Sequence, residues 1–299
     1  MASVGTASRP SNWAVAFESR FDLSLALSLL LLLLYSHRYW YIQTPLSVIA
    51  LTALIFPQVR TSPSLWAVAT FLVAVGTYIN WYSVDNHKYL LAYWCVAIFG
   101  ALLTRDPEQT AAKAAHRLIG LVFLFAVLQK TISDDYLNRT FFYYELLLDE
   151  RFSGLAKYLG GIPDQINALN MAARRALVNY DSTLTEVHLR GTETIAKLAL
   201  LITWGGYLIE VIIGAAFLTP PATWLSRMRD VWLLVFLFST YLFAPVIGFG
   251  WVLAIMGIAQ TEIQRTRIRA LYVVAFLFLQ VYRIPWREFS ALLLKLNPA

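Results

Sequence analysis

Long apolar runs recur along almost the whole chain, and they limit its possible folds more than any other feature. Six runs are clear candidates for helices that span a membrane: residues 21–36, 64–82, 89–104, 118–131, 194–218 and 270–282. Three shorter runs are ambiguous, because about 10–14 apolar residues also suit re-entrant or buried helices: residues 45–56, 231–243 and 246–258. We therefore predict an all-α, polytopic transmembrane helix bundle with about eight to nine spans.

Composition excludes a water-soluble globular protein. Of 299 residues, 59% are apolar and 14% are charged, whereas soluble domains are about half apolar and about a quarter charged. Few residues remain for loops, so we predict a single integral membrane domain over residues 1–299. The net charge of +6 is the Lys and Arg excess that cytoplasmic loops carry. The lipid bilayer is thus an expected partner and nucleic acid is not.

The distribution of basic residues predicts the orientation. With a cytoplasmic N-terminus and nine crossings, the inner side collects most of them: Arg9, Arg20, Arg60, Arg105, Lys113, Arg117, Arg227, Arg229, Arg265, Arg267 and Arg269. This bias is the positive-inside rule. It favours two crossings around Ala244 and Pro245 over one long kinked helix. We predict an integral protein of a bacterial inner membrane or an equivalent membrane.

The longest stretch between spans, residues 132–193, faces the exoplasmic side in this topology. It is too apolar for a disordered linker, and Gly160, Gly161 and Pro163 divide it. Apolar residues recur at helical spacing after that division. We predict two amphipathic helices that lie at the membrane surface and form a lid over the bundle.

Ionisable side chains at membrane depth are costly and therefore point to function. His87, Lys130 and Glu210 are in such places. Asp85 or Asn86 caps the fourth span, which puts His87 in the first helical turn. Lys130 closes the fifth span. The topology brings His87 and Lys130 to the same membrane face on adjacent antiparallel helices.

Each of these residues has a structural interpretation as well. Lys130 can be an interfacial anchor paired with Asp134, or a desolvated amine that acts as a general base. His87 can simply cap or pack the helix. Glu210 is more simply a hydrogen-bonded structural glutamate than a proton relay.

Two further features have structural interpretations. Gly205 and Gly206 are expected to allow close helix packing. No histidine or carboxylate spacing is diagnostic of a metal site, so none is predicted.

Short motifs give a family resemblance. The segment Asn86-His87-Lys88-Tyr89-Leu90, a span that ends at Lys130, and then Tyr136-Leu137-Asn138 resemble the HTTM membrane domain that is shared with vitamin K-dependent gamma-glutamyl carboxylase. Glu210 and Leu218-Thr219-Pro220-Pro221 fall where that family carries a membrane glutamate and a proline-containing turn. The resemblance is strongest over residues 85–152.

The resemblance implies a site and a cofactor. In the carboxylase, a lysine that matches Lys130 is the base acting on reduced vitamin K, and a histidine that matches His87 assists it. Catalytic Lys130 and His87 are therefore expected here, with a reduced quinone as the possible cofactor. Asn86, Asp134, Tyr136 and Glu210 are the remaining residues expected in the substrate or cofactor pocket.

The chain also departs from the family pattern. Val127 and Arg139 stand where glycine is usual, and residues 239–241 lack the histidine of many members. The large C-terminal lumenal domain that grips peptides in the carboxylase has no counterpart before Ala299. A stand-alone HTTM protein is therefore a better expectation than a peptide carboxylase.

Three functional hypotheses remain open from the sequence. The first is a carboxylase-like, lyase-type enzyme that acts on a quinone-like or other lipid-soluble substrate, or modifies a peptide. The second is a non-catalytic membrane subunit whose 132–193 lid docks a membrane or peptide partner. The third is a small transporter that depends on Glu210.

Overall fold

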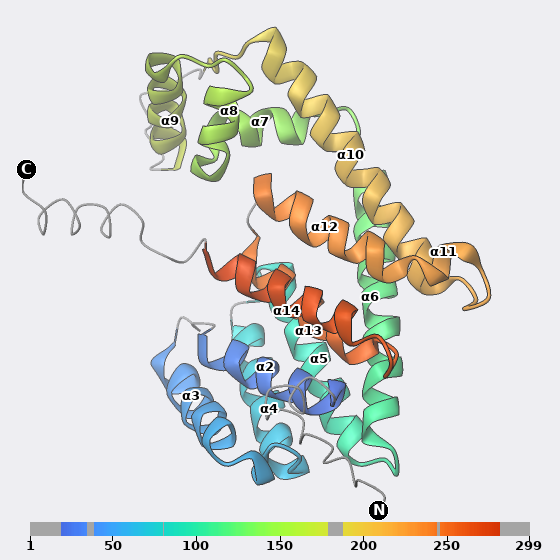
Figure 1. The fold of residues 1–299 in the computed structure, drawn as a ribbon. Helices are drawn as coiled ribbons and strands as arrows, with labels where there is room; N and C mark the ends of the chain where they lie inside the picture. Colours follow the sequence, from blue (N-terminus) through green and yellow to red (C-terminus); the bar gives the residue numbers. More distant parts are fainter. Residues whose placement is uncertain (1–18, 35–38, 80, 179–187, 244–245, 282–299) are drawn as a thin grey trace, which may run out of the picture. The chain divides into compact units, whose positions relative to one another are not determined.

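The computed structural model describes residues 19–34, 39–79, 81–178, 188–243 and 246–281. Helices follow one another throughout (Figure 1): α2 (Arg20–Leu34), α3 (Trp40–Ile55), η1 (Pro57–Val59), α4 (Pro63–Ile79), α5 (Asn86–Leu102), α6 (Pro107–Ile132), α7 (Thr140–Leu148), η2 (Glu150–Phe152), α8 (Ser153–Tyr158), α9 (Asp164–Val178), α10 (Glu193–Leu218), α11 (Trp224–Arg227), α12 (Arg229–Phe243), α13 (Ile247–Gln260) and α14 (Thr266–Gln280). No β-strand occurs in the described ranges, which confirms the all-α class.

Within the described residues, each predicted apolar run overlaps one helix, but two helices stand out by length. α6 and α10 each have 26 residues and are long and apolar enough to cross a membrane. At ~1.5 Å per residue they are about 39 Å long, against a hydrocarbon core of ~30 Å. α3, α4 and α13 are apolar but shorter. α6 begins at Pro107, well before the predicted start at 118. The sequence prediction missed these first turns because they carry Glu108, Lys113 and Arg117 and are not apolar.

The described helices belong to two compact units. The first comprises residues 1–119 and 246–299, and the second comprises residues 120–245. α6 runs from the first unit into the second.

In the first unit, α13 is the central helix. It packs against α2, α5 and α14, while α2 to α5 pack in sequence order. Nearly all of α13 is buried, as expected for a helix that is apolar on every side. Gly257 lets α13 approach α14, because a Cβ atom there would lie 2.5 Å from the ring of Tyr272.

Charged side chains gather where several helices of the first unit begin or end. Arg20 pairs with Glu108 at 2.8 Å, and Arg60 pairs with Asp22 at 3.2 Å. The buried Arg269 donates hydrogen bonds of 2.9 Å to two carbonyls of the turn between α13 and α14. Arg20, Arg60 and Arg269 belong to the predicted inner group. The side of a membrane that they face stays a prediction, and Arg9, Ala244 and Pro245 lie outside the described residues.

The second unit is organised on α10. α7, α11 and α12 pack on this helix, and α8 and α9 pack on α7. Figure 1 shows α7, α8 and α9 grouped near the N-terminal part of α10. A small core holds this group together, and its members are fully or almost fully buried: Leu146, Leu147, Phe152, Ala156, Ile162, Ile195 and Ala199. We call residues 140–178 the insertion helices.

The insertion helices are more divided than the sequence predicted. Instead of two helices, this stretch has three α-helices and one 3₁₀ helix. The Asp149 side chain accepts a hydrogen bond from the Arg151 backbone N–H at 2.8 Å, which starts η2. Gly161 has a φ of +66°, and Pro163 follows just before α9. A left-handed glycine and a proline both stop a helix locally.

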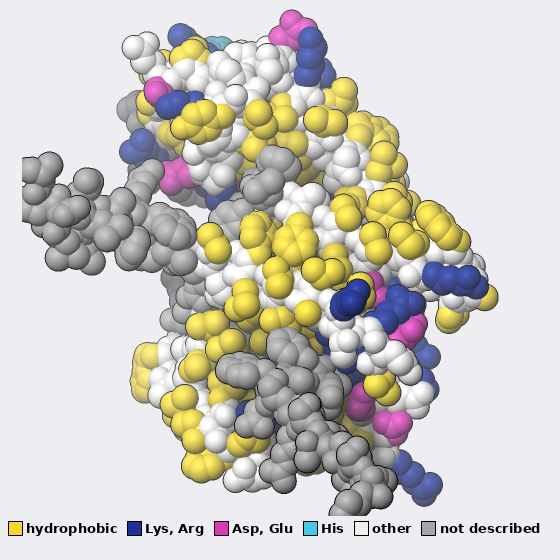
Figure 2. Space-filling view, viewed as in Figure 1, with side chains coloured by type: hydrophobic (Ala, Val, Ile, Leu, Met, Phe, Trp, Pro, Cys, Tyr) yellow, Lys and Arg dark blue, Asp and Glu magenta, His cyan; other side chains and the backbone are white. Residues whose placement is uncertain are grey.

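Large apolar side chains are exposed along several helices. On α10 they include Leu200, Leu201, Trp204 and Leu208, and on α3 they include Trp40, Val48, Leu51 and Ile55. Figure 2 shows apolar side chains spread along α10. Soluble monomers rarely expose apolar patches of this kind, whereas lipid-facing helices do.

The close contact at Gly257 predicts a stability effect. Gly257→Ala should lower the free energy of unfolding by about 1–3 kcal/mol, because the new methyl group meets the fully buried Tyr272 ring. Gly100→Ala is the matched control, since nothing lies within 4 Å of a Cβ atom there. Thermal unfolding of the detergent-purified protein measures both. Equal stability of the two variants would contradict the packing at Gly257.

The insertion helices should respond to pH through Glu145 and Asp149. Burial, with a hydrogen bond to Asp149 and its charge, raises the pKa of Glu145 above 4.5. Burial would also raise the pKa of Asp149, but hydrogen bonds from Arg151 outweigh it and lower this pKa below 3.8. The stability that Glu145 contributes is complete below pH 4.5 and is lost as pH rises through its raised pKa. The stability that Asp149 contributes is complete above pH 3.8 and is lost as pH falls through its lowered pKa.

Hydrogen exchange tests this pH response. Protection of residues 140–178 should fall from mildly acidic to neutral pH, and Glu145→Gln should remove most of that fall. Glu150→Gln, at an exposed neighbouring position, is the control and should behave like the wild type. A pH profile that Glu145→Gln leaves unchanged would rule out this residue as the cause.

Candidate functional site

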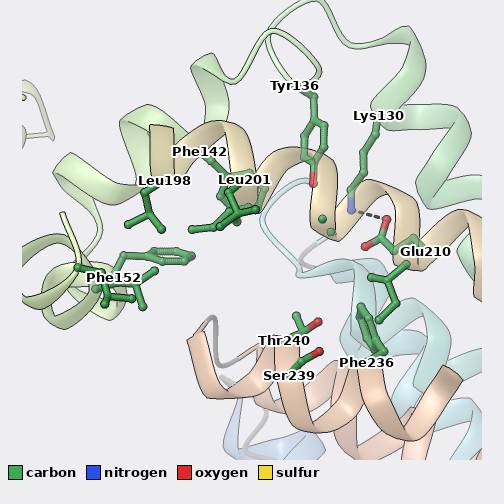
Figure 3. A pocket seen from close by; sticks show the side chains of 16 residues that line it. Lys130, Tyr136, Phe142, Phe152, Leu198, Leu201, Glu210, Phe236, Ser239 and Thr240 are labelled. Carbon is green, nitrogen blue, oxygen red and sulfur yellow. Dashed lines mark hydrogen bonds and ion pairs between the residues drawn. The ribbon is translucent and has the colours of Figure 1, made fainter. Parts of the chain in front are cut away.

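A cavity of about 410 Å³ lies in the second unit. Small-molecule sites range over about 300–1,000 Å³. Its walls come from the end of α6, the turn after it, the insertion helices, α10 and α12 (Figure 3). Most lining residues are apolar, and the complete set is Lys130, Tyr136, Phe142, Phe152, Leu155, Leu159, Leu198, Leu201, Ile202, Gly205, Gly206, Ile209, Glu210, Phe236, Ser239 and Thr240. This is an apolar chamber with a few polar groups.

Two opposite charges meet in the wall of this cavity. Lys130 Nζ donates a hydrogen bond to Glu210 Oε2, and the side chains are only 22% and 11% exposed. Figure 3 shows the two side chains pointing toward one another from α6 and α10. Burying either charge alone costs several kcal/mol, so each charge is stable in this place only when the other compensates it.

The contact between α6 and α10 sets this pair in register. Gly120 allows close approach, because a Cβ atom there would lie 2.7 Å from the Leu218 side chain. Nearer the pair, the Thr131 and Tyr207 hydroxyl groups are 2.9 Å apart. Lys130 lies in the last turn of α6, and its long side chain reaches Glu210.

Tyr136 brings a hydroxyl group to the same place. The Arg139 backbone N–H donates to the Tyr136 carbonyl at 3.0 Å and closes the turn after α6. The Tyr136 ring stacks on Phe141 with centroids 5.6 Å apart, and Lys130 Nζ lies 4.9 Å from its centroid. Burial, and secondarily the Glu210 charge, raises the pKa of Tyr136. The phenol therefore stays protonated and can donate a hydrogen bond.

Gly205 and Gly206 border open space in the cavity rather than another helix, and we call this space the floor of the cavity. A Cβ atom at Gly205 would meet nothing within 4 Å, and one at Gly206 would meet only the Tyr136 hydroxyl at 3.9 Å. The expectation of close helix packing at these glycines is therefore wrong. Their missing side chains leave room beside Tyr136, and Ser239 and Thr240 line the cavity from α12 (Figure 3).

The predicted site residues divide between the two units. Lys130, Tyr136 and Glu210 come together in the cavity. Asp134 is exposed and is not among the lining residues; its carbonyl accepts a hydrogen bond from the Asn138 amide at 2.7 Å. The ion-pair partner of Lys130 is Glu210 rather than the Asp134 of the anchor interpretation.

The remaining two predicted residues, Asn86 and His87, open α5 in the first unit. Asp85 is the N-cap residue but makes no side-chain capping bond, and its Oδ2 lies 3.8 Å from His87 Nε2. The meeting of His87 with Lys130 stays a prediction.

The sequence interpretation missed the Lys130–Glu210 pair and the apolar walls. It considered Glu210 separately from Lys130, as a structural glutamate. The rule that intramembrane charges pair with one another was the signal available. The cavity-facing side of α10 also had a signal, because Ile202, Gly206, Ile209 and Glu210 recur at helical spacing.

Comparison with known proteins adds no assignment. No protein-family model, no curated protein and no solved structure matches this chain. Within the described residues there is no group of three or more His, Cys, Asp or Glu side chains that could hold a metal ion.

The buried pair makes a prediction for stability. Lys130→Met should destabilise the protein by about 3–5 kcal/mol, because it leaves the Glu210 carboxylate buried without its partner. Adding Glu210→Leu should recover most of the loss, since no uncompensated charge remains. Thermal unfolding of the two single variants and the double variant in detergent measures the coupling. Additive losses would mean that the two residues do not depend on each other.

Proposed function

We propose that this chain is an integral membrane enzyme of the HTTM type, with Lys130 as a base acting on a quinone-like or other lipid-soluble substrate. The observation that carries the proposal is an ion pair in the wall of an otherwise apolar cavity of about 410 Å³. Such a chamber suits a lipid-soluble molecule, and its charges suit proton transfer.

The membrane part of the proposal is a bundle of eight to nine spans with the insertion helices as an exoplasmic lid. Its support is the match of each apolar run to a helix, the length of α6 and α10, and the apolar side chains exposed on α3 and α10. The gathering of Arg20, Arg60 and Arg269 in the first unit agrees with an inner basic side. We propose that the N-terminus is cytoplasmic, as the positive-inside rule predicts.

The chemistry follows from the pair. If the Lys130 ammonium transfers its proton to the Glu210 carboxylate, the neutral amine can take a proton from a substrate hydroxyl group. The new ammonium then stabilises the oxygen anion beside it, and the Tyr136 hydroxyl adds a hydrogen bond. The apolar walls exclude water and so strengthen both interactions.

A reduced quinone fits these residues and would supply the acidic hydroxyl groups. Its ring would face the polar end of the cavity and its tail the leucines. The HTTM resemblance would have His87 polarise an oxygen of the same substrate and would add Asn86 to the pocket, whereas the exposed Asp134 is left out of this proposal. Peptide modification remains a variant of this proposal.

Partner docking is the second candidate, because the insertion helices present aromatic side chains outward. Phe141 is 40% and Tyr144 is 49% exposed, whereas Phe142 lines the cavity. A docking subunit would lose its complex on Tyr144→Ala and tolerate Lys130→Arg, which keeps a positive charge beside Glu210. An enzyme would show the opposite pattern. The third hypothesis, a small transporter, would instead require Glu210 for proton-dependent uptake into vesicles.

A quinol assay tests the proposed enzyme. Purified full-length protein in detergent is given reduced menaquinone and dissolved O₂, and oxygen uptake is followed. Uptake reports proton removal, because the deprotonated quinol loses two electrons to O₂ and becomes the quinone, while O₂ is reduced to hydrogen peroxide. Lys130→Met should lower the uptake rate by about 10²–10⁴-fold, because the base is removed. Lys130→Arg should fail as well, since a guanidinium does not give up its proton at neutral pH.

Lys157→Met is the matched control, because Lys157 is a surface lysine paired with Asp164. Its uptake rate should equal that of the wild type. Uptake by the wild type no faster than without protein, or undiminished uptake by Lys130→Met, would remove the proposal.

A further inference from the structure

The cavity contains charge but has no net charge. Lys130 and Glu210 are the charged residues among its lining residues, and they bind each other. A bound molecule therefore meets one positive and one negative group together. The polar end of the cavity is neutral as a whole.

Without Glu210, the same cavity would favour anions. An ammonium in an apolar chamber attracts a carboxylate strongly, because the local dielectric is low. A free fatty acid is a long-chain molecule with such a carboxylate head. With Glu210 in place, such a head group would bring a second negative charge next to the first, and only one ammonium would compensate both.

The remaining polar groups suit an uncharged head. An ammonium has three hydrogens, and one of those on Lys130 is donated to Glu210. Tyr136 and Ser239 also line the cavity, from the turn after α6 and from α12 (Figure 3), and Ser239 Oγ donates to the Val235 carbonyl at 2.7 Å. Donors and acceptors of this kind satisfy a hydroxyl or carbonyl head, and the open floor at Gly205 and Gly206 leaves it space.

The other end of the cavity suits one hydrocarbon chain. Its lining residues there are Phe152, Leu155, Leu159, Leu198 and Leu201. Leu159 is 55% and Leu201 is 70% exposed, so the wall continues to the outside of the unit. The cavity volume of about 410 Å³ lies in the lower part of the range of small-molecule sites, which is about 300–1,000 Å³. This volume suits a head with one chain rather than two chains.

We infer that Glu210 determines which lipids the cavity accepts. By cancelling the charge of Lys130, it makes the cavity select single-chain amphiphiles with an uncharged hydroxyl or carbonyl head and reject long-chain carboxylates. The inference rests on the proposed function only in placing a lipid-soluble molecule in this cavity. It adds the charge of the head group and the residue that enforces it.

Two ligands with the same chain test this selectivity. Full-length protein in detergent at pH 8 is titrated with radiolabelled 1-hexadecanol and with radiolabelled palmitate. The wild type should bind the alcohol at least tenfold more tightly. Glu210→Gln should invert the preference, because an uncompensated ammonium then attracts the carboxylate. Glu193→Gln, at an exposed position on the same helix, should leave the wild-type preference unchanged.

Two more variants keep the test decisive. The exchange Lys130→Glu with Glu210→Lys retains a neutral pair and should retain the preference for hexadecanol, even where Glu210→Gln unfolds. Gly206→Leu should abolish hexadecanol binding by filling the floor, while Gly100→Leu, also at an open position, should not. Thermal unfolding of each variant checks that it is folded.

The failures are distinguishable from those of the enzyme proposal. Equal or tighter binding of palmitate by the wild type, or an unchanged preference in folded Glu210→Gln, overturns the inference. In that case, Lys130-dependent oxygen uptake with reduced menaquinone would still support the enzyme. If neither hexadecanol nor palmitate binds the wild type, the inference falls, and the quinol assay decides the proposed function separately.

Discussion

The second unit depends on one electrostatic requirement, which is that the charges of Lys130 and Glu210 compensate each other away from water. An isolated charge in such a place costs several kcal/mol, so α6 and α10 must meet in a single register. Gly120 permits this approach, and the Thr131 and Tyr207 hydroxyl groups add a second link. The pair thereby fixes where two 26-residue helices contact each other.

The insertion helices complete the chamber around that pair. Their small core includes Leu147 and Phe152, and it is anchored on α10 through Ile195 and Ala199. The same group contributes Phe142 and Phe152 to the cavity wall. Tyr136 joins the two parts, because its ring packs on Phe142 with centroids 5.6 Å apart while Lys130 Nζ lies 4.9 Å from its centroid. A change in the position of the insertion helices would therefore move the Tyr136 ring relative to the ion pair.

The sequence was sufficient to predict the apolar helices, because a run of apolar residues long enough for a helix is visible in the order of the residues alone. It was insufficient where polar residues form helix, as in the first turns of α6, and where a side chain such as Asp149 starts a new turn inside an apolar stretch. It identified Lys130, Tyr136 and Glu210 one at a time but did not pair the two charges. Which residues pair depends on the register of α6 against α10, and nothing local in the sequence specifies that register.

The cavity contains two features that do not stabilise a helix bundle: a buried ion pair and two glycines inside a helix. A buried ion pair can be replaced by apolar side chains of similar volume without loss of stability and often with a gain, so stability alone does not call for Lys130 and Glu210. Glycine inside a helix costs about 1 kcal/mol relative to alanine, yet Gly205 and Gly206 face open space instead of a packed neighbour. Both departures occur on the same face of α10, beside one tyrosine hydroxyl group. Local departures of this kind concentrate at functional sites, and here each serves the same end, because the glycines make room for a molecule and the pair provides the charges that act on it.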